Sequence, residues 1–269
     1  GRFSDATSQY ENIVLSTRNS QQGIFDSFML AKSKAMRDLT KLAAKNLQSA
    51  YEKLDKEQKA RETVAVADAL FKAGSVTEAL ALLPEDLSGI NQKYLCDAML
   101  TRAKILAVKG DLEGALSAAT KATELKDIDY EQKSDAWFVL SELQLMKKDL
   151  AGAEASANKS LECYVKSPEA YGMLGRVALL KGDSKTALSN AKRAMDLNPY
   201  YPAAYLLQGD AQMEAGATKD ARASYRKAVE LYPGNLEAHR SLLQALKKLS
   251  LTEEAKREEE QIAQLESMR

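Results

Sequence analysis

A repeat with a period of about 34 residues constrains the fold of this chain more than any other feature of its sequence. One constant interval separates four ring-bearing side chains, which are Trp137, Tyr171, Tyr205 and His239. The same interval separates four alanines, which are Ala153, Ala187, Ala221 and Ala255. Self-similarity at a fixed period of about 20 to 50 residues indicates stacked structural units, each of which buries its apolar face against its neighbours.

The alanine series continues toward the N-terminus at Ala115, Ala79 and Ala6, with loop insertions on the way. We expect this alanine where two helices of a unit cross, because only a small side chain permits their close approach. The expected turns contain glycines that tolerate left-handed backbone angles, namely Gly74, Gly110, Gly182 and Gly216. Gly175 and Gly209 lie inside expected helices, where glycine costs about 1 kcal/mol against alanine. We expect tight packing at both positions to offset that cost.

One unit carries the whole pattern in Tyr171, Leu174, Gly175, Ala187, Ala194 and Pro199. This pattern resembles the tetratricopeptide-repeat (TPR) family, whose repeat has the same length. The resemblance implies an all-α fold: a right-handed TPR superhelical solenoid of antiparallel helix pairs, preceded here by one long non-repeat helix. Pro168 and Pro202 are expected at the first position of their helices, where a missing N–H is harmless.

The repeat register divides the chain into four parts. Residues 1–15 are expected to form the second helix of a truncated TPR, and residues 16–59 a connecting segment. Residues 60–95 are expected to form a degenerate TPR whose second helix Pro84 cuts short. We expect five TPR-like units in residues 96–269, of which the last acts as a C-terminal cap. The acidic residues of this cap are expected to face solvent rather than to dock on a partner.

Within the connecting segment, helical spacing of apolar residues without Pro or Gly predicts one long amphipathic helix over residues 24–53. This helix either covers an end of the solenoid or docks on a partner or in the protein's own groove. Asp55 and Gln58 have the spacing of a capping box, which predicts that a further helix begins after Asp55.

The chain lacks the residue clusters that chemistry requires. His239 is its only histidine and occupies an aromatic position of the repeat, which favours a packing role. No P-loop is present, and one histidine with two separated cysteines makes no zinc-type ligand set. We predict no catalytic residue, no cofactor and no metal. Cys96 and Cys163 are too few for a disulfide scaffold, which favours the cytoplasm and leaves a periplasmic origin open.

Charge and hydropathy exclude two further classes of partner. The 38 basic and 38 acidic residues give a formal net charge of zero, and aromatic residues make up only 6% of the chain. Neither feature favours nucleic acid. No apolar run approaches the roughly 20 residues that cross a bilayer, so we expect no direct membrane insertion. The expected partners are proteins.

The TPR resemblance implies that the first helices of the units line a concave surface that holds a peptide or helix. The first column of the repeat register is largely apolar and consists of Val64, Leu100, Phe138, Gly172, Leu206 and Arg240. A charged middle column contains Asp68, Lys104, Glu142, Arg176 and Asp210, followed by Gln244. A third column contains Phe71, Ala107, Leu145, Leu179, Met213 and Lys247.

These columns suit an amphipathic helix or a mixed-charge extended segment, although the charges of the middle column could instead pair with one another. Gly172 is expected to leave a notch for a bulky side chain. The Lys, Asn and Arg set with which co-chaperone TPR proteins hold a terminal carboxylate is absent from these columns.

The leading hypothesis is a scaffold for protein–protein interaction that binds a peptide or helix of a partner in the concave groove. Two alternatives stay open at this point. One is a self-assembly module that stacks through its terminal repeats, and the other is a non-catalytic regulatory domain of a larger protein.

Overall fold

The computed structural model describes residue 42 and residues 45–267, and these residues form helices and connecting turns without a strand. Residues 45–52 are helical. The remaining helices are α3 (Lys56–Lys72), α4 (Val76–Leu82), α5 (Gln92–Val108), α6 (Leu112–Glu124), α7 (Tyr130–Met146), α8 (Leu150–Cys163), α9 (Pro168–Leu180), α10 (Ser184–Leu197), α11 (Pro202–Glu214), α12 (Thr218–Leu231), α13 (Leu236–Lys248) and α14 (Thr252–Ser267). The expected helix at 1–15 and most of the long helix at 24–53 lie outside the described residues.

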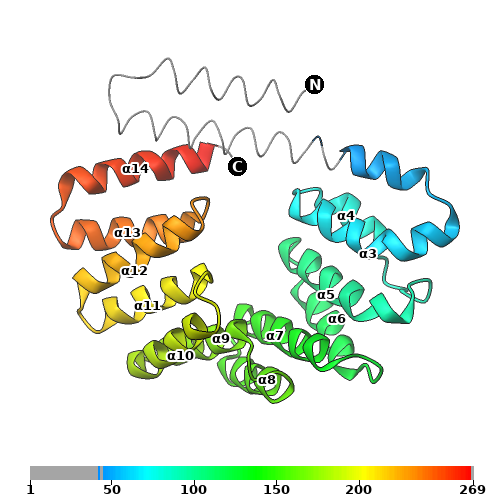
Figure 1. Ribbon diagram of the computed structural model, residues 1–269, viewed down its shortest axis with the longest axis horizontal. Coiled ribbons are helices and arrows are strands. Elements are labelled where there is room, and N and C mark those ends of the chain that lie inside the picture. Colours follow the sequence, from blue (N-terminus) through cyan, green and yellow to red (C-terminus); the bar gives the residue numbers. More distant parts are fainter. Residues whose placement is uncertain (1–41, 43–44, 268–269) are drawn as a thin grey trace.

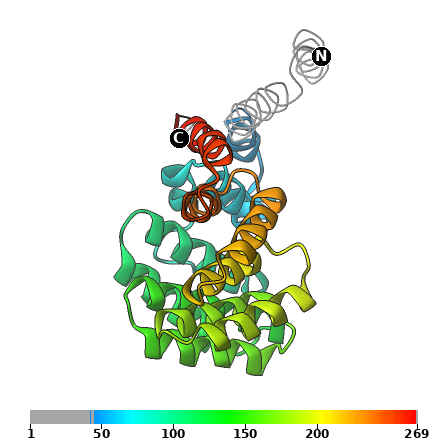
Figure 2. The ribbon, with the colours of Figure 1, turned by 90° about the vertical axis from the view of Figure 1, so that its left-hand side faces the viewer.

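The helices stack as consecutive pairs along a curved path (Figures 1 and 2). The odd-numbered helices α3 to α13 each contact the next odd-numbered helix, whereas the described even-numbered helices make no such contacts with one another. Helices that touch across repeats must lie closer together than helices that do not. The odd-numbered helices therefore form the inner, concave side of the arc, and the even-numbered helices form its outer side.

Local sequence signals set the ends of the helices as expected. The Asp55 side chain accepts a hydrogen bond from the Gln58 backbone N–H at 2.8 Å, and the Gln58 side chain accepts from the Asp55 N–H at 3.1 Å. This is the predicted capping box at the start of α3. Pro168 and Pro202 are the first residues of α9 and α11. Helix α4 ends at Leu82, shortly before Pro84.

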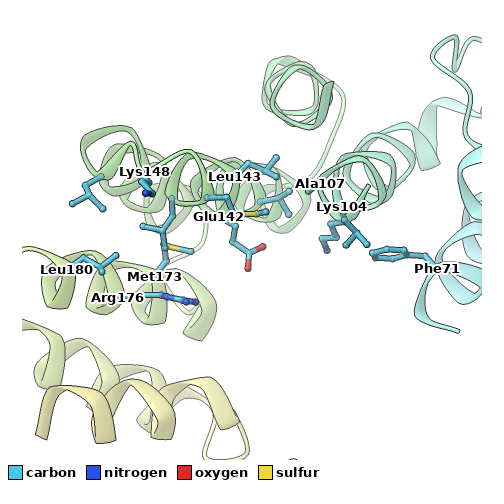
Figure 3. Close-up of a pocket in the computed structure, with 14 residues that line it drawn as sticks. Phe71, Lys104, Ala107, Glu142, Leu143, Lys148, Met173, Arg176 and Leu180 are labelled. Carbon is cyan, nitrogen blue, oxygen red and sulfur yellow. The ribbon is translucent and has the colours of Figure 1, made fainter. Parts of the chain in front are cut away.

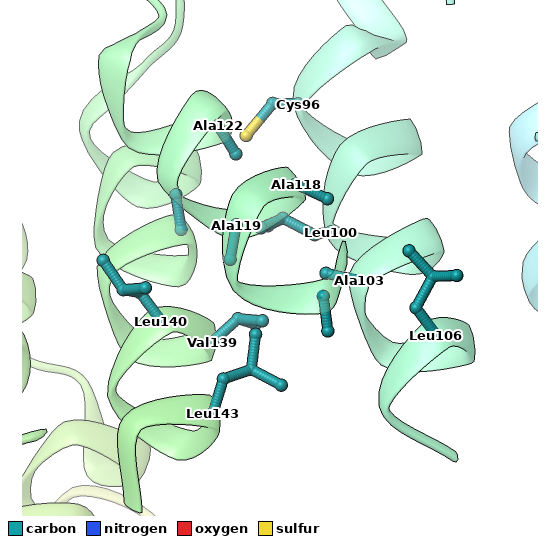
Figure 4. Close-up of a cluster of buried hydrophobic side chains, with 12 residues drawn as sticks. Cys96, Leu100, Ala103, Leu106, Ala118, Ala119, Ala122, Val139, Leu140 and Leu143 are labelled. Carbon is teal, nitrogen blue, oxygen red and sulfur yellow. The ribbon is translucent and has the colours of Figure 1, made fainter. Parts of the chain in front are cut away.

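The recurrent small residues lie where the helices of a pair cross. The repeat alanines Ala79, Ala115, Ala153, Ala187 and Ala221 have no exposed surface, and Ala255 is 6% exposed. Figure 4 shows one such core, in which alanines of α6 pack between larger side chains of α5 and α7. A Cβ atom on Gly209 would lie 2.4 Å from the ring of Tyr225. The small residues therefore permit the close packing that the repeat pattern predicts.

The turns within the pairs use left-handed backbone angles at every repeat from α3 to α14. Four of these positions are glycines, as expected, with φ between 78° and 87°. The other two are Lys148, with φ of 65°, and Ser250, with φ of 59°. The turn geometry is thus common to all these repeats, even where the sequence supplies no glycine.

The ring-bearing positions of the repeat pack against neighbouring elements. The Lys159 ammonium lies 4.2 Å from the centre of the Trp137 ring, and the Tyr205 hydroxyl donates to the Pro199 carbonyl at 3.0 Å. His239 is 5% exposed and contacts Glu258 of α14. Trp137, Tyr205 and His239 thus each contact a neighbouring element.

Candidate functional site on the concave face

A cavity of about 830 Å³ opens on the concave side between α3, α5, α7 and α9 (Figure 3). We call it the central groove. Its lining residues are Phe71, Lys104, Ala107, Val108, Val139, Glu142, Leu143, Leu145, Met146, Lys148, Leu150, Met173, Arg176 and Leu180. Ligand pockets in proteins usually have volumes of about 300–1,000 Å³ and mostly apolar walls. The central groove falls within that range.

Three apolar side chains at the rim of the central groove are exposed to solvent. Val108 is 65% exposed, and Met146 and Leu180 are each 58% exposed. They end α5, α7 and α9, so successive repeats place them side by side on one edge of the concave face. Contiguous exposed apolar surface is uncommon on soluble proteins and often marks an interaction site.

Three charged side chains point into the same space from the neighbouring helices α5, α7 and α9 (Figure 3). They are Lys104, Glu142 and Arg176. Burial raises the pKa of Glu142 above its usual value, although the positive charges of Lys104 and Arg176 act in the opposite direction. Within the described residues, neither Lys104 nor Glu142 comes close enough to any group to form an ion pair.

A second, smaller cavity of about 170 Å³ continues the concave face toward α11. It shares Glu142, Met173 and Arg176 with the central groove. Its other lining residues are Phe138, Gly172, Tyr201, Ala203, Leu206, Leu207, Asp210, Asn235 and Glu237. The shared residues join the two cavities into one surface over α7, α9 and α11.

The notch expected at Gly172 is not open, because Tyr201 fills it. A Cβ atom on Gly172 would lie 3.3 Å from the Tyr201 ring. Tyr201 precedes α11 in a loop, and burial raises its pKa, with the negative charges of Glu169 and Glu142 acting in the same direction. The absent side chain at Gly172 thus accommodates a tyrosine of the same chain rather than a partner.

Asp210 is held by its own repeat. Its carboxylate accepts a hydrogen bond from the Tyr225 hydroxyl at 2.8 Å. Burial raises the pKa of Asp210, which the hydrogen bond and the positive charge of Arg176 oppose. One Asp210 oxygen therefore serves the repeat core, while the residue still lines the second cavity.

A further acidic column lies on the concave face and was not recognised in the sequence. It consists of Asp97, Asp135, Glu169 and Glu237, near the starts of α5, α7, α9 and α13. Burial raises the pKa of Asp135; Lys104 opposes the rise, and the negative charges of Glu169 and Asp97 add to it. Arg176 approaches this column with its Nη2 atom 3.9 Å from a Glu237 oxygen.

The two cavities bring together ten residues of the three columns. These are Phe71, Lys104, Ala107, Phe138, Glu142, Leu145, Gly172, Arg176, Leu206 and Asp210. The other eight line neither cavity. Arg240 and Lys247 pair with Glu266 and Glu259 of α14, and Gln244 is exposed. Val64 and Leu100 are buried in the core between helices, Leu179 and Met213 pack against buried clusters, and Asp68 pairs with Lys72 at 2.6 Å.

The part of the chain that the structure describes has neither a membrane-spanning helix nor a metal-binding cluster. None of the helices there is both long enough and apolar enough to span a bilayer. In the same residues, no three His, Cys, Asp or Glu side chains are grouped so as to hold a metal ion. Both cysteines of the chain are free thiols, with Cys96 buried and Cys163 half-buried.

Comparison with known proteins identifies the repeat. The family model described as tetratricopeptide repeat matches residues 100–170 and 172–235, which is just over half of the chain. No curated protein sequence matches the chain.

Solved structures share the arrangement of helices at low sequence identity. A crystal structure of the APC/C hetero-tetramer Cut9–Hcn1 aligns with a TM-score of 0.66 and 16% identity, over 98% of this chain and 50% of that one. PilF of Pseudomonas aeruginosa aligns with a TM-score of 0.59 and 15% identity, over 78% of this chain and 93% of that one. A crystal structure of MamA has 24% identity and a TM-score of 0.47, over 61% and 94% of the two chains. The first two likenesses show the fold alone.

Proposed function

Because the chain belongs to the tetratricopeptide-repeat family, we propose that it is a scaffold that holds a segment of a partner protein on its concave face. The observation that carries this proposal is the central groove, with its exposed rim of Val108, Met146 and Leu180. Covering apolar surface contributes roughly 25 cal/mol per Å² removed from water. A partner segment that covers this rim with apolar side chains would gain this contribution to its binding free energy.

The charges of the groove support a role in specificity. Lys104, Glu142 and Arg176 lie within the apolar walls, where partial burial strengthens their interaction with a ligand. Charged groups placed in this way select partners and fix their register more than they raise affinity. The groove thus combines apolar area with a few polar groups, as peptide-binding surfaces do.

The test uses a display library of helix-forming peptides selected on the wild-type protein. The groove variant is Met146→Ser/Leu180→Ser, and the matched control is Val165→Ser/Tyr232→Ser. The control residues are 59% and 57% exposed and lie at the opposite ends of the repeats, so the two variants remove similar exposed apolar surface. Both variants should fold, because exposed substitutions change stability by about 0.5 kcal/mol or less.

Fluorescence anisotropy of the enriched peptides decides the outcome. The groove variant should bind them at least about tenfold more weakly than wild type, which corresponds to about 1.4 kcal/mol. The control variant should bind them as wild type does. Equal affinity for both variants would overturn the assignment of the groove.

Self-association through the same rim is the second candidate function, and the exposed apolar side chains are the observation that favours it. Sedimentation velocity over a range of protein concentrations separates the two. A dimer that the groove variant dissociates and the control variant preserves would favour self-association. A monomer at all concentrations leaves the groove to other partners.

A further inference from the structure

Acidic residues outnumber basic residues among the charged groups that the concave face brings together. The acidic groups are Asp97, Asp135, Glu142, Glu169, Asp210 and Glu237, and the basic groups are Lys104, Lys148 and Arg176. The chain as a whole is formally neutral, so this excess is local.

Some carboxylates outside the concave face form ion pairs across repeats. Arg222 and Arg226 both contact Glu254, at 2.9 and 2.6 Å, and Lys181 contacts Glu154 at 2.5 Å. Among the described residues, the carboxylates of the concave face form only one ion pair with a basic group, the long Arg176–Glu237 contact of 3.9 Å. Most of the concave carboxylates thus have no ion-pair partner among the described residues.

These carboxylates also interact with each other. The charge of Glu169 raises the pKa of both Asp135 and Glu142, and the charge of Glu237 raises that of Asp210. Burial is the larger cause in each case. Like charges that are partly desolvated and close together favour a cation from outside, because it would relieve their repulsion and replace lost hydration.

The acidic column and the apolar rim have a fixed relation in three successive repeats. Asp97 precedes Val108, Asp135 precedes Met146 and Glu169 precedes Leu180, each by the same interval along one helix. This interval is about three helical turns, so the two members of each pair lie on the same side of their helix, roughly 16 Å apart. The concave face thus carries an apolar stripe and a parallel acidic stripe across α5, α7 and α9.

We propose that the segment held in the central groove is a cationic amphipathic helix, with its apolar face on Val108, Met146 and Leu180 and with Lys or Arg side chains directed toward Asp97, Asp135 and Glu169. This inference rests on the proposed function, since it names the class of segment that the groove holds. A helix with side chains is about 10–12 Å across, so one helix laid along the apolar stripe brings long basic side chains within reach of the acidic stripe. Adjacent packed helices are about 8–10 Å apart, so about four turns of partner helix span the three repeats.

The charge pattern disfavours the other occupants. An acidic peptide would place like charges against Asp135 and Glu169, which costs affinity. A second copy of this neutral chain offers no general positive charge to match the acidic stripe. Both occupants are outcomes of the experiment below.

The experiment analyses the same peptide selection for charge. Peptides enriched on wild type should have a positive net charge, with apolar residues at intervals of three and four. The acidic-stripe variant Asp135→Asn/Glu169→Gln should bind these peptides about tenfold more weakly and should show a smaller loss of affinity between low and high salt. The matched control Glu162→Gln/Asp196→Asn removes two carboxylates from the outer helices α8 and α10 and should bind as wild type does.

The outcomes separate this inference from the proposed function. Two outcomes would overturn the cationic class and leave the groove assignment standing. In the first, peptides that bind the groove variant more weakly are neutral or acidic. In the second, such peptides bind the acidic-stripe variant as tightly as wild type. Peptides that bind the groove variant as well as wild type would overturn both. Dimer formation that depends on the rim, without peptide binding, would also overturn the cationic helix as occupant.

Discussion

The imidazole of His239 on α13 lies against the carboxylate of Glu258 on α14, and both side chains are largely buried. The other ring nitrogen, Nε2, donates to the Pro233 carbonyl at 2.9 Å. Burial lowers the pKa of His239, but the hydrogen bonds to Glu258 and Pro233 and the charge of Glu258 outweigh it, so the pKa lies above its usual value. A protonated His239 therefore ties the last two helices together.

We expect the contribution of His239 to stability to fall as pH rises. Because its folded-state pKa exceeds the unfolded value of about 6.5, the contribution is fully present below that value and is lost as pH rises through the folded-state pKa. Urea unfolding of wild type and His239→Gln should differ most near pH 6 and least at high pH. Glu259→Gln, on α14 beside Glu258, is the control and should keep the wild-type pH dependence. A difference that is constant or grows with pH would contradict the assignment.

Substitution of Gly209 by alanine should destabilise the protein. The new Cβ atom would lie 2.4 Å from the Tyr225 ring, which is 2% exposed and tied to Asp210 by its hydroxyl. Overpacking of this kind costs about 1–3 kcal/mol, which exceeds the roughly 1 kcal/mol that alanine gains over glycine in a helix. Thermal unfolding measures the net loss. Gly89→Ala is the control, because its Cβ atom would meet nothing within 4 Å.

Substitution of Ser250 by glycine should stabilise the protein by about 0.5–1 kcal/mol, because Ser250 has φ of 59°. This left-handed angle is unfavourable for residues with a side chain and free of strain for glycine. Lys148→Gly should act in the same direction for the same reason. The control is Lys109→Gly, because Lys109 has φ of −74° and glycine there only adds freedom to the unfolded chain. A loss of stability in Ser250→Gly, measured by thermal unfolding, would contradict the strain argument.

Cys96 should resist thiol reagents until the protein unfolds. Its side chain has no exposed surface, and burial, with the nearby charges of Asp97 and Asp135, raises its pKa to about 12. At pH 8 only about one Cys96 in 10,000 would be a thiolate, which is the reactive form. Cys163 is half-buried and should react first. Reaction with iodoacetamide followed by peptide mass analysis gives both rates. Equal rates for the two thiols in the folded protein would contradict this assignment.

Local sequence signals account for most of the fold. Several helix ends are specified by groups that are adjacent in sequence, so the sequence suffices to place these ends. The groups are Asp55 with Gln58, Pro84, Pro168 and Pro202. The repeat alanines specify close packing through their size alone. Lys148 could not be recognised as a left-handed turn residue, because its backbone angle follows from the repeat geometry around it rather than from its own side chain.

The candidate site was harder to predict, because the curvature of the stack decides which helix positions face inward. The repeat register predicts three columns of inward-facing residues. The concave face also includes Asp135 and Glu169 at one margin and Met146 and Leu180 at the other. Leu100 belongs to a predicted column and is nevertheless buried by its neighbours. The filling of the Gly172 notch depends on Tyr201, a loop residue outside the helical periodicity.

The nearest-neighbour arrangement of the helices has a consequence for how the molecule comes apart. Each described helix from α3 to α14 contacts only helices one or two places away along the chain. Among the described helices, loss of α14 therefore removes support mainly from α13, together with the ion pairs that Glu254 forms with Arg222 and Arg226 of α12. Opening should proceed inward from an end, one pair at a time. The central groove lies on α5, α7 and α9, several pairs from α14. Fraying or proteolytic trimming of the last helices should thus leave the central groove intact, so damage at the C-terminal end would not disturb the surface that we propose to hold a partner.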